Sequence, residues 1–254
     1  MYELTLSAYR GASVARKFAQ KYSVALLARN PANYESLVKE IEAAGGKAIG
    51  ISTDCSDGAS VKKAFEQLKS AMGGAKLTAA IYNVGGRFVR KPFMELNEED
   101  FVAGFEANGR GGFHFAQACL PLLLDATDLE YPPTLIFTSA TAAMKGSAQC
   151  SSFATGKFAM RALAQSLARE FGPKGVHTVH AIIGQYSEAT NGCDADLDLQ
   201  DGVIDIERTK QYQFEHEDAK IKPEAIADSY WYLHTQPRTC FTNELDIRPY
   251  IEKW

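Results

Sequence analysis

The feature that most constrains the fold is a regular alternation of two kinds of segment. Short runs rich in aliphatic and β-branched residues alternate with longer stretches in which apolar residues recur at helical spacing. Because the short runs are apolar at nearly every position, each predicts a strand covered on both faces. Strands of this kind, joined by helical crossovers, form a parallel sheet with helices on both sides. We therefore expect an α/β fold with a doubly wound parallel sheet.

The expected elements follow one another along the whole chain. The strands are expected at 24–28, 47–53, 77–82, 134–138, 177–183 and 244–247, and the helices at 34–44, 60–72, 113–124, 157–170 and 223–233. Gly45 and Gly73 follow the first two helices, where a C-cap glycine belongs. No internal repeat, low-complexity tract or linker interrupts the pattern. We expect a single domain over residues 1–254.

Charge and cysteine usage exclude several classes of protein. The net charge is −4, and the lysines and arginines are scattered, so we expect neither a nucleic-acid footprint nor a basic membrane patch. No apolar run approaches the ~20 residues that cross a bilayer, and no signal peptide is visible. The five cysteines are far apart and lack CxxC spacing, which is typical of reduced thiols. We expect a cytoplasmic protein.

Ligands of a doubly wound sheet bind beyond the carboxyl ends of the strands, so the residues there are the first candidates for a site. Arg29 and Asn30 follow the strand at 24–28. A guanidinium there suits the 2′-phosphate of NADP, whereas an acidic residue would suit the ribose hydroxyls of NAD. A solvated surface arginine is the alternative. Asp54 follows the next strand, where its carboxylate could accept from an adenine amino group.

Further polar or small residues mark the later strand ends. Asn83 and Gly85 follow the strand at 77–82, and a residue without a side chain lets the backbone approach a ligand closely. Asn108 lies in a helix-patterned region and is followed by glycine, which costs ~1 kcal/mol in a helix relative to alanine. Ser139 follows the next strand, and Lys157 opens a helix. Their order and spacing indicate one shared crevice.

With these residues the chain resembles the short-chain dehydrogenase/reductase family, from Gly11 to its C-terminus. The resemblance rests on Asp54, Asn108, Ser139, Lys157 and the stretches 12–19, 83–85, 163–172 and 244–249. It implies a Rossmann fold, a small-molecule substrate, and NADP(H) as cofactor, with NAD as the other option. It also implies catalytic roles for Ser139, Lys157 and Asn108. The cofactor-binding residues that it implies are Gly11, Arg29, Asn30, Asp54, Asn83, Gly85, Lys157 and Gly184.

The chain departs from the family at the catalytic tyrosine, because Phe153 stands four residues before Lys157. Phenylalanine has no proton to transfer, and general acid–base help contributes typically ~10²–10⁴ in rate. The hydroxyls that could substitute are those of Ser139, Ser151, Ser152, Thr155 and Tyr186. Tyr186 is the preferred substitute because it follows Gly184, where the family often carries Pro-Gly beside the nicotinamide. An aromatic ring lining the substrate pocket is the alternative reading of Tyr186.

A second departure lies at the front of the chain. The family has a TGxxxGxG loop whose glycines let the backbone contact the pyrophosphate. Gly11 matches the third glycine, but Tyr9 and Thr5 stand at the other two positions. Either 3–6 forms a shortened strand with a tight turn at 7–10, or the start of the chain has been replaced. We expect weakened dinucleotide binding.

The remaining motifs favour no metal site. The acidic segment 194–206 lacks the EF-hand pattern and lies in the variable lid expected at about 186–222. His177 and His180 are three apart on an expected strand, so their side chains should face opposite sides. The other histidines form no cluster.

Three functions remain open. The first is an NADP(H)-dependent oxidoreductase acting on a carbonyl/alcohol pair. The second is a lyase, isomerase or cyclase on the same scaffold without hydride transfer. The third is a non-catalytic protein with impaired cofactor binding. The resemblance also implies a homodimer or homotetramer built through helices 109–125 and 151–170. Aromatic residues in the lid and tail favour a substrate that is neither very small nor highly charged.

Overall fold

A parallel sheet forms the centre of the computed structural model, which describes residues 1–6, 8–86, 88–184, 204–205 and 216–252. Within these residues seven strands pair in the order β3-β2-β1-β4-β5-β6-β7, and every pair is parallel. They are β1 (Tyr2–Leu6), β2 (Ser23–Ala28), β3 (Ala48–Ser52), β4 (Leu77–Tyr82), β5 (Thr134–Ala140), β6 (His177–Ile183) and β7 (Glu244–Ile247). This confirms the expected doubly wound fold.

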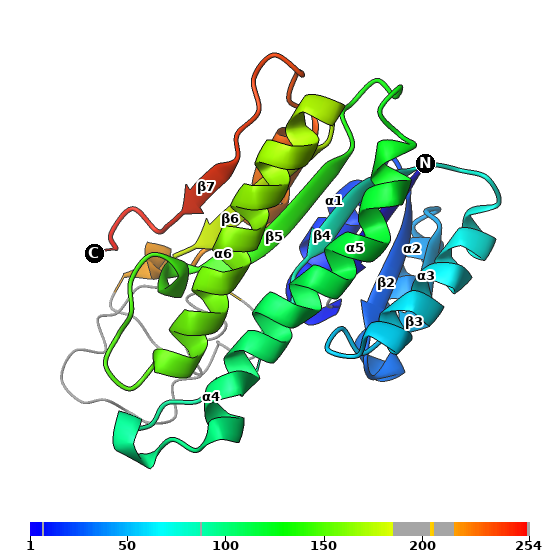
Figure 1. Ribbon diagram of the computed structural model, residues 1–254. Coiled ribbons are helices and arrows are strands. Elements are labelled where there is room, and N and C mark those ends of the chain that lie inside the picture. The colour runs from blue at the N-terminus through cyan, green and yellow to red at the C-terminus, as the bar shows by residue number, and fades with distance from the viewer. Residues whose placement is uncertain (7, 87, 185–203, 206–215, 253–254) are drawn as a thin grey trace.

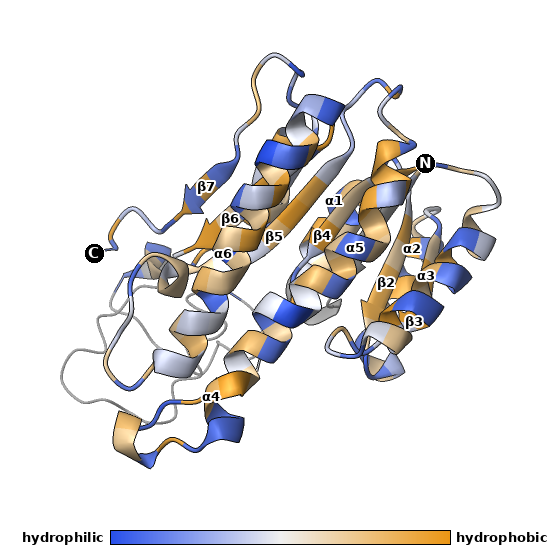
Figure 2. Cartoon of the chain, in the orientation of Figure 1, coloured by the Kyte–Doolittle hydropathy of each residue, from blue (hydrophilic) through white to orange (hydrophobic). Residues whose placement is uncertain are grey.

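Helices cover both faces of the sheet, with α5 and α6 in front of it in Figure 1. The helices are α1 (Ala8–Ala19), α2 (Glu35–Ala43), α3 (Gly58–Met72), α4 (Glu98–Phe105), α5 (Gly111–Leu124), α6 (Ser151–Phe171) and α7 (Pro223–His234). One core joins α3, α5 and α6 to the sheet through residues such as Phe65, Phe115 and Phe137. On the opposite face α1, α2 and α7 pack through residues such as Phe18 and Tyr230. In Figure 2 the strands β2, β4 and β6 are mostly orange, whereas β7 at the edge of the sheet is mostly blue.

Most expected elements lie within a few residues of the observed ones. Gly45 and Gly73 end their helices with positive φ angles of 83° and 54°, as their predicted C-cap role requires. Two boundaries were wrong. β5 continues to Ala140, so Ser139 lies inside the strand, and α6 begins at Ser151 rather than at Lys157. Phe153 and Lys157 therefore stand one turn apart on the same helix.

The front of the chain forms a short strand at the centre of the sheet. β1 pairs with β2 on one side and with β4 on the other, which favours the shortened-strand alternative. The expected turn at 7–10 was wrong, because α1 already begins at Ala8. Ser7 lies outside the described residues. One residue thus separates the strand from the helix, so the N-terminus of α1 meets the carboxyl end of β1 directly.

The strand order reverses between β1 and β4, where a doubly wound sheet forms its ligand crevice. The carboxyl ends of all seven strands meet at this edge because every pair is parallel. Most of the lid expected at about 186–222 lies outside the described residues, including Tyr186.

Candidate functional site

Two buried polar atoms at the carboxyl edge mark the centre of the site. Ser139 is 4% exposed and Asn108 is 0% exposed. The hydroxyl of Ser139 and the Oδ1 atom of Asn108 have no hydrogen-bond partner within the described parts of the chain. A buried polar group left unpaired costs about 1–3 kcal/mol. Such groups at a ligand-binding edge indicate atoms that a bound molecule or water would satisfy.

Asn108 is held in place by an irregular helix. It lies in a π-helical turn, η3 (Glu106–Arg110), between α4 and α5, and its Nδ2 atom donates to the Gly104 carbonyl at 2.9 Å. Single π-helical turns often occur at functional sites. A Cβ atom on Gly86 would lie 2.8 Å from the Cβ of Ala107. The loop after β4 therefore packs directly on this turn, which leaves only Oδ1 of Asn108 to face a ligand.

Lys157 and Phe153 come from the first two turns of α6. Lys157 is 5% exposed, and its Nζ atom lies 5.7 Å from the centre of the Phe153 ring. Phe153 is 3% exposed and meets Phe88 edge-to-face, with 5.2 Å between ring centres. The Phe153 ring thus packs against the Phe88 ring on one side and faces the Lys157 ammonium on another.

The other hydroxyls near Phe153 are not equivalent. Ser152 donates to the carbonyls of Asp100 and Phe101 at 2.7 and 2.9 Å, so it fastens α6 to α4. Thr155 is exposed on the outer side of the helix. The Ser151 hydroxyl is buried and has no partner among the residues described. Of the helix hydroxyls named as substitutes for the tyrosine, Ser151 alone is therefore both buried and uncommitted.

The edge at β2 and β3 carries the residues expected at an adenosine. Arg29 is exposed just after β2, and its charge helps to lower the pKa of Asp54. The main cause of that lowering is the hydrogen bond that Asp54 accepts from the Ser56 hydroxyl at 2.7 Å. Asn30 has a local role, because its side chain accepts from Ala32 N–H at 3.1 Å and caps the 3-10 turn η1 (Pro31–Asn33).

The remaining expected cofactor residues lie at the same edge. Asn83 is buried and Gly85 is half-buried in the loop after β4. Gly11 is buried within α1. Gly184 closes β6, and its N–H donates to the Ile247 carbonyl at 2.7 Å.

The segment after β7 folds over Gly184. A Cβ atom on Gly184 would lie 2.5 Å from Cγ of Arg248 and 2.4 Å from a carboxylate oxygen of Glu252. Arg248 pairs with Glu252 and also with Asp246, at 2.7 Å for the latter. The close approach that glycine permits at this position is therefore to the chain's own tail.

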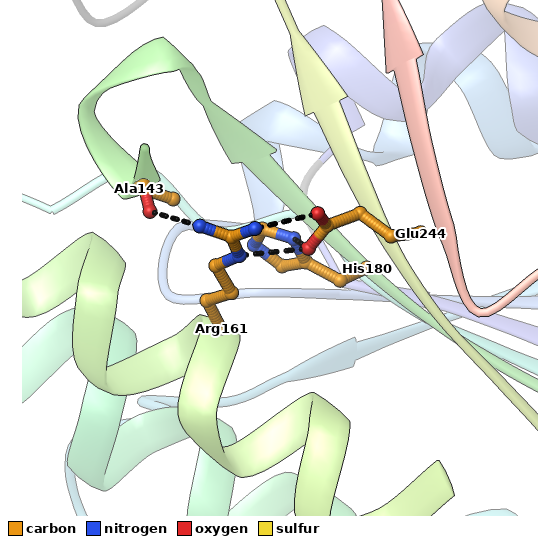
Figure 3. Close-up of polar contacts among 4 residues, drawn as sticks. All are labelled: Ala143, Arg161, His180 and Glu244. Atoms are coloured by element: carbon orange, nitrogen blue, oxygen red, sulfur yellow. Dashed lines mark hydrogen bonds and ion pairs between the residues drawn. The ribbon is translucent and has the colours of Figure 1, made fainter. Parts of the chain in front are cut away.

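A polar network that the sequence did not reveal joins Arg161, Glu244, His180 and the Ala143 carbonyl (Figure 3). Arg161, one turn after Lys157, donates to both oxygens of Glu244 at 2.8 and 2.7 Å, and to the carbonyl of Ala143 at 3.3 Å. Glu244 also lies 3.2 Å from Nδ1 of His180. The Arg161 guanidinium thus joins α6 to η4 (Thr141–Ala143) and β7, and Glu244 extends the network to His180 on β6.

His177 and His180 face opposite sides of the sheet, as their spacing predicts. His177 contacts the Leu233 carbonyl at the end of α7, whereas His180 faces α6. In the described parts of the chain, no group of three or more His, Cys, Asp or Glu side chains is arranged to hold a metal ion. None of the described helices is long and apolar enough to cross a membrane.

Comparison with known proteins gives one consistent result. A family model described as short chain dehydrogenase matches residues 10–192. An L-2,3-butanediol dehydrogenase of Corynebacterium glutamicum is 31% identical over 179 residues, which cover 69% of this chain and 66% of that protein. A 3beta-hydroxysteroid dehydrogenase of Mediterraneibacter gnavus is 26% identical over 173 residues, covering 68% of this chain and 60% of that protein. The chain thus spans less than two thirds of the length of each of these two relatives, 66% of the first and 60% of the second.

Solved structures share the fold over the full length. A short-chain dehydrogenase from Rhodopseudomonas palustris superposes with a TM-score of 0.75 at 30% identity, covering 98% of this chain and 99% of that one. An alcohol dehydrogenase from Thermococcus sibiricus complexed with 5-hydroxy-NADP gives a TM-score of 0.78 at 20% identity, covering 100% and 99%. At that identity the second likeness shows the fold alone.

Proposed function

This chain belongs to the short-chain dehydrogenase family, and on that premise we propose that it is an NADP(H)-dependent oxidoreductase acting on a carbonyl/alcohol pair. The observation that carries the proposal is the pair of unpartnered buried atoms, Ser139 Oγ and Asn108 Oδ1, at the carboxyl edge of the sheet. Lys157 is buried on the helix that follows this edge. These are the side chains through which the family binds a substrate oxygen and a cofactor ribose.

The two ends of the crevice fit a dinucleotide. Arg29 and Asp54 lie at the β2–β3 edge, where the 2′-phosphate and the adenine would bind, and the exposed guanidinium favours NADP over NAD. Unpartnered donors and acceptors lie at the other end. When bound, the dinucleotide supplies or accepts the hydride. A solved relative titled as an NADP complex has the same fold, with a TM-score of 0.76 at 21% identity.

The middle of the crevice fits less well. No glycine occurs in residues 1–10, and one residue joins β1 to α1, so this chain has no glycine-rich loop to surround a pyrophosphate. The N-terminus of a helix such as α1 favours an anion in general, because its first N–H groups lack partners within the helix and its dipole is positive there. We therefore propose weaker dinucleotide binding than in relatives with an intact loop.

Each site residue then has a defined task. The Ser139 hydroxyl binds the substrate oxygen, Asn108 Oδ1 holds a water, and Lys157 binds the ribose. Phe153 lines the pocket and transfers no proton. The proton is exchanged with water or with Tyr186, and the slower exchange lowers turnover by a factor of the order of 10²–10⁴ relative to a tyrosine-bearing site.

A second candidate function uses the same pocket without hydride transfer. The observation that favours it is the Phe153 ring, which Phe88 and Lys157 fix in place of a proton donor. In a lyase, isomerase or cyclase, Ser139 and Lys157 would polarise a substrate oxygen. A non-catalytic protein is the third candidate, and its distinguishing property would be failure to bind NADPH.

The test begins with the fluorescence of NADPH on mixing with the protein, which an oxidoreductase enhances and a non-catalytic protein leaves unchanged. Turnover with NADPH is measured next, on a panel of carbonyl compounds that includes acetoin and a 3-ketosteroid. These two are chosen because two relatives are named as dehydrogenases of the corresponding alcohols, 2,3-butanediol and a 3beta-hydroxysteroid. We expect slow turnover by the wild type. An inert wild type together with an active Phe153→Tyr variant would contradict the oxidoreductase assignment.

We also propose that the chain assembles with copies of itself. Apolar side chains that stand 36–46% exposed lie on three successive helices. They are Phe101, Val102 and Phe105 on α4, Phe113 on α5 and Phe158 on α6. Exposed apolar groups gathered on neighbouring elements favour a protein interface. Light scattering after size-exclusion chromatography should give the mass of a dimer or tetramer, and Phe105→Glu with Phe113→Glu should shift it toward the monomer.

A further inference from the structure

His180 is a buried imidazole to which the proposed function assigns no role. It is 0% exposed at the middle of β6, and it faces α6. Its Nδ1 atom lies 3.2 Å from Oε2 of Glu244, whose two oxygens are also bound by Arg161. Because a carboxylate only accepts hydrogen bonds, the proton of His180 resides on Nδ1. The Nε2 atom is then a hydrogen-bond acceptor.

The charge state of His180 keeps Nε2 an acceptor at neutral pH. Burial lowers the pKa of His180 to about 4, and the positive charges of Lys157 and Arg161 on α6 contribute to the lowering. Glu244, on β7, acts in the opposite direction but does not outweigh burial. The imidazole is therefore neutral at pH 7, and it presents a lone pair on Nε2.

That lone pair has no partner among the residues the structure describes. Nε2 points away from Glu244, on the side of the ring where Arg161 reaches across to Ala143 (Figure 3). Ala143 ends the turn that follows β5, four residues after Ser139. A buried acceptor left unpaired is unfavourable, so a donor that satisfies it stabilises the site.

Ser139 is placed to be that donor. The register pairs Phe137 with His180 and Ser139 with Ile182, so Ser139 lies one step diagonally from His180 on the neighbouring strand. Phe137 packs in the core under α5 and α6, and alternation along β5 puts Ser139 on that same face. Two unpartnered atoms, one a donor and one a pure acceptor, thus occupy neighbouring positions on one face of the sheet.

We propose that His180 is a positioning residue whose Nε2 atom accepts a hydrogen bond that the Ser139 hydroxyl donates through one bridging water. The polar network then runs from Ser139 through the water to His180, and from His180 to Glu244, which Arg161 also binds while it donates to the Ala143 carbonyl. A serine hydroxyl has one proton, so a Ser139 that donates to His180 offers only lone pairs to a ligand. On the basis of the proposed function, the site therefore binds the alcohol of the substrate pair, which carries an O–H, more tightly than the carbonyl.

A rival donor provides the control. The Thr178 hydroxyl is also buried without a partner in the described residues, and it lies two residues before His180 on the same face of β6. It stands toward the amino end of the strand, on the far side of His180 from Ser139. Thr178→Val removes this hydroxyl at nearly constant shape, as Ser139→Ala removes the other.

The first experiment needs no activity. In protein labelled with ¹⁵N-histidine, the His180 ring should show a proton on Nδ1 and none on Nε2 at pH 7. Ser139→Ala should move the Nε2 resonance, and Thr178→Val should leave it in place. A proton on Nε2, or a resonance that responds to Thr178→Val and not to Ser139→Ala, overturns the proposal.

The second experiment separates ground-state binding from turnover. The probes are 2,3-butanediol and acetoin with NADP⁺ and NADPH. His180→Leu should raise KM for the alcohol about tenfold with little change in KM for the carbonyl, the loss expected for one hydrogen bond. His180→Gln, whose amide oxygen can accept a hydrogen bond, should bring KM for the alcohol most of the way back to the wild-type value. Thermal unfolding shows whether each variant is folded. Equal changes in both KM values overturn the alcohol preference. An inert wild type together with an active Phe153→Tyr variant contradicts the proposed function, and the NMR result then decides on His180.

Discussion

The ammonium of Lys157 lies 5.7 Å from the centre of the Phe153 ring, one turn earlier on α6. In this geometry the lysine faces the aromatic ring at the position where the family resemblance leads us to expect a tyrosine. An ammonium near a ring face is attracted to its negative quadrupole, which holds the pair together. The ring therefore helps to keep Lys157 in place while contributing nothing to proton transfer. This relationship gives the most accessible prediction of the account.

Phe153→Tyr should raise turnover by about 10²-fold, because the new hydroxyl would stand beside Lys157 as a general acid. Initial rates with NADPH and the carbonyl panel measure the gain. Phe158→Tyr is the control, since Phe158 lies on the same helix but is 43% exposed on its outer side. A gain equal in both variants, or no gain in Phe153→Tyr, would contradict the placement of Phe153 at the reacting centre.

Arg29→Ala should weaken NADPH binding about tenfold and leave NADH binding nearly unchanged, because only NADPH carries the 2′-phosphate that a guanidinium can bind. The side chain is exposed, so folding stability should change little. Calorimetric titration with both cofactors measures the difference, and Lys69→Ala on α3 controls for loss of one positive charge. An equal loss of affinity for both cofactors would mean that Arg29 does not bind the 2′-phosphate.

Gly156→Ala should destabilise the fold by about 1–3 kcal/mol, because a Cβ atom there would lie 2.2 Å from the carbonyl oxygen of Gly104. The clash would push α4 away from α6 and displace η3, so the variant should also lose NADPH turnover. Gly172→Ala is the matched control, since nothing lies within 4 Å of its added Cβ atom. Urea unfolding measures both variants, and equal stabilities would show that the two helices do not approach so closely.

Stability should also depend on pH through a second buried histidine. The Tyr22 hydroxyl and Nε2 of His234 are 3.0 Å apart, and Nδ1 of His234 lies 3.0 Å from Oγ1 of Thr134. Because Thr134 donates its own proton to the Pro132 carbonyl, the proton of His234 resides on Nδ1. Burial lowers the pKa of His234 to about 3, and the nearby charges of His177 and Lys21 act in the same direction.

The sign of the pH effect follows from these values. The unfolded chain binds a proton on each histidine below about pH 6.5, whereas folded His234 and His180 bind theirs only near pH 3 and pH 4. The contribution of these two neutral histidines to the free energy of unfolding is fully present above pH 6.5. It falls as the pH is lowered, by up to about 1.4 kcal/mol per pH unit for each histidine. Urea unfolding at pH 7 and pH 5 should show this loss. The His234→Gln variant should be less stable than the wild type at pH 7 but should lose less stability between pH 7 and pH 5. If it loses as much stability as the wild type over this interval, His234 is not a neutral buried histidine.

Much of the fold could be predicted because the strands are covered on both faces. β4, β6 and β7 have the predicted bounds; β4 and β6 are buried at every position and are followed by Asn83 and Gly184, whereas β7 is a partly exposed edge strand. The start of α6 was missed because 151–156 are mostly small or polar residues without an apolar repeat. Contacts with α4 hold this first turn in the helix, including the hydrogen bonds of Ser152 to two carbonyls of that helix.

The site was only partly predictable because several of its contacts join residues that are far apart in the sequence. Ser139, Asn108 and Lys157 could be identified from family resemblance, and their roles stay proposals. Asn30 was assigned to the cofactor, although an Asn before Pro31 is also a helix-capping pattern, and its side chain caps η1. Arg161 and Glu244 are 83 residues apart, and His180 and Glu244 are 64 apart. Such contacts follow from strand order, which no local pattern encodes.

The most direct test of the central claim is hydride transfer itself, measured in a single turnover of stereospecifically deuterated NADPH with acetoin or another carbonyl that the wild type accepts. We expect deuterium to move to the former carbonyl carbon, which is the carbinol carbon of the product. Ser139→Ala and Lys157→Met should each slow the transfer at least about tenfold. NADPH that binds but never yields deuterated alcohol, with any carbonyl of the panel, would contradict it.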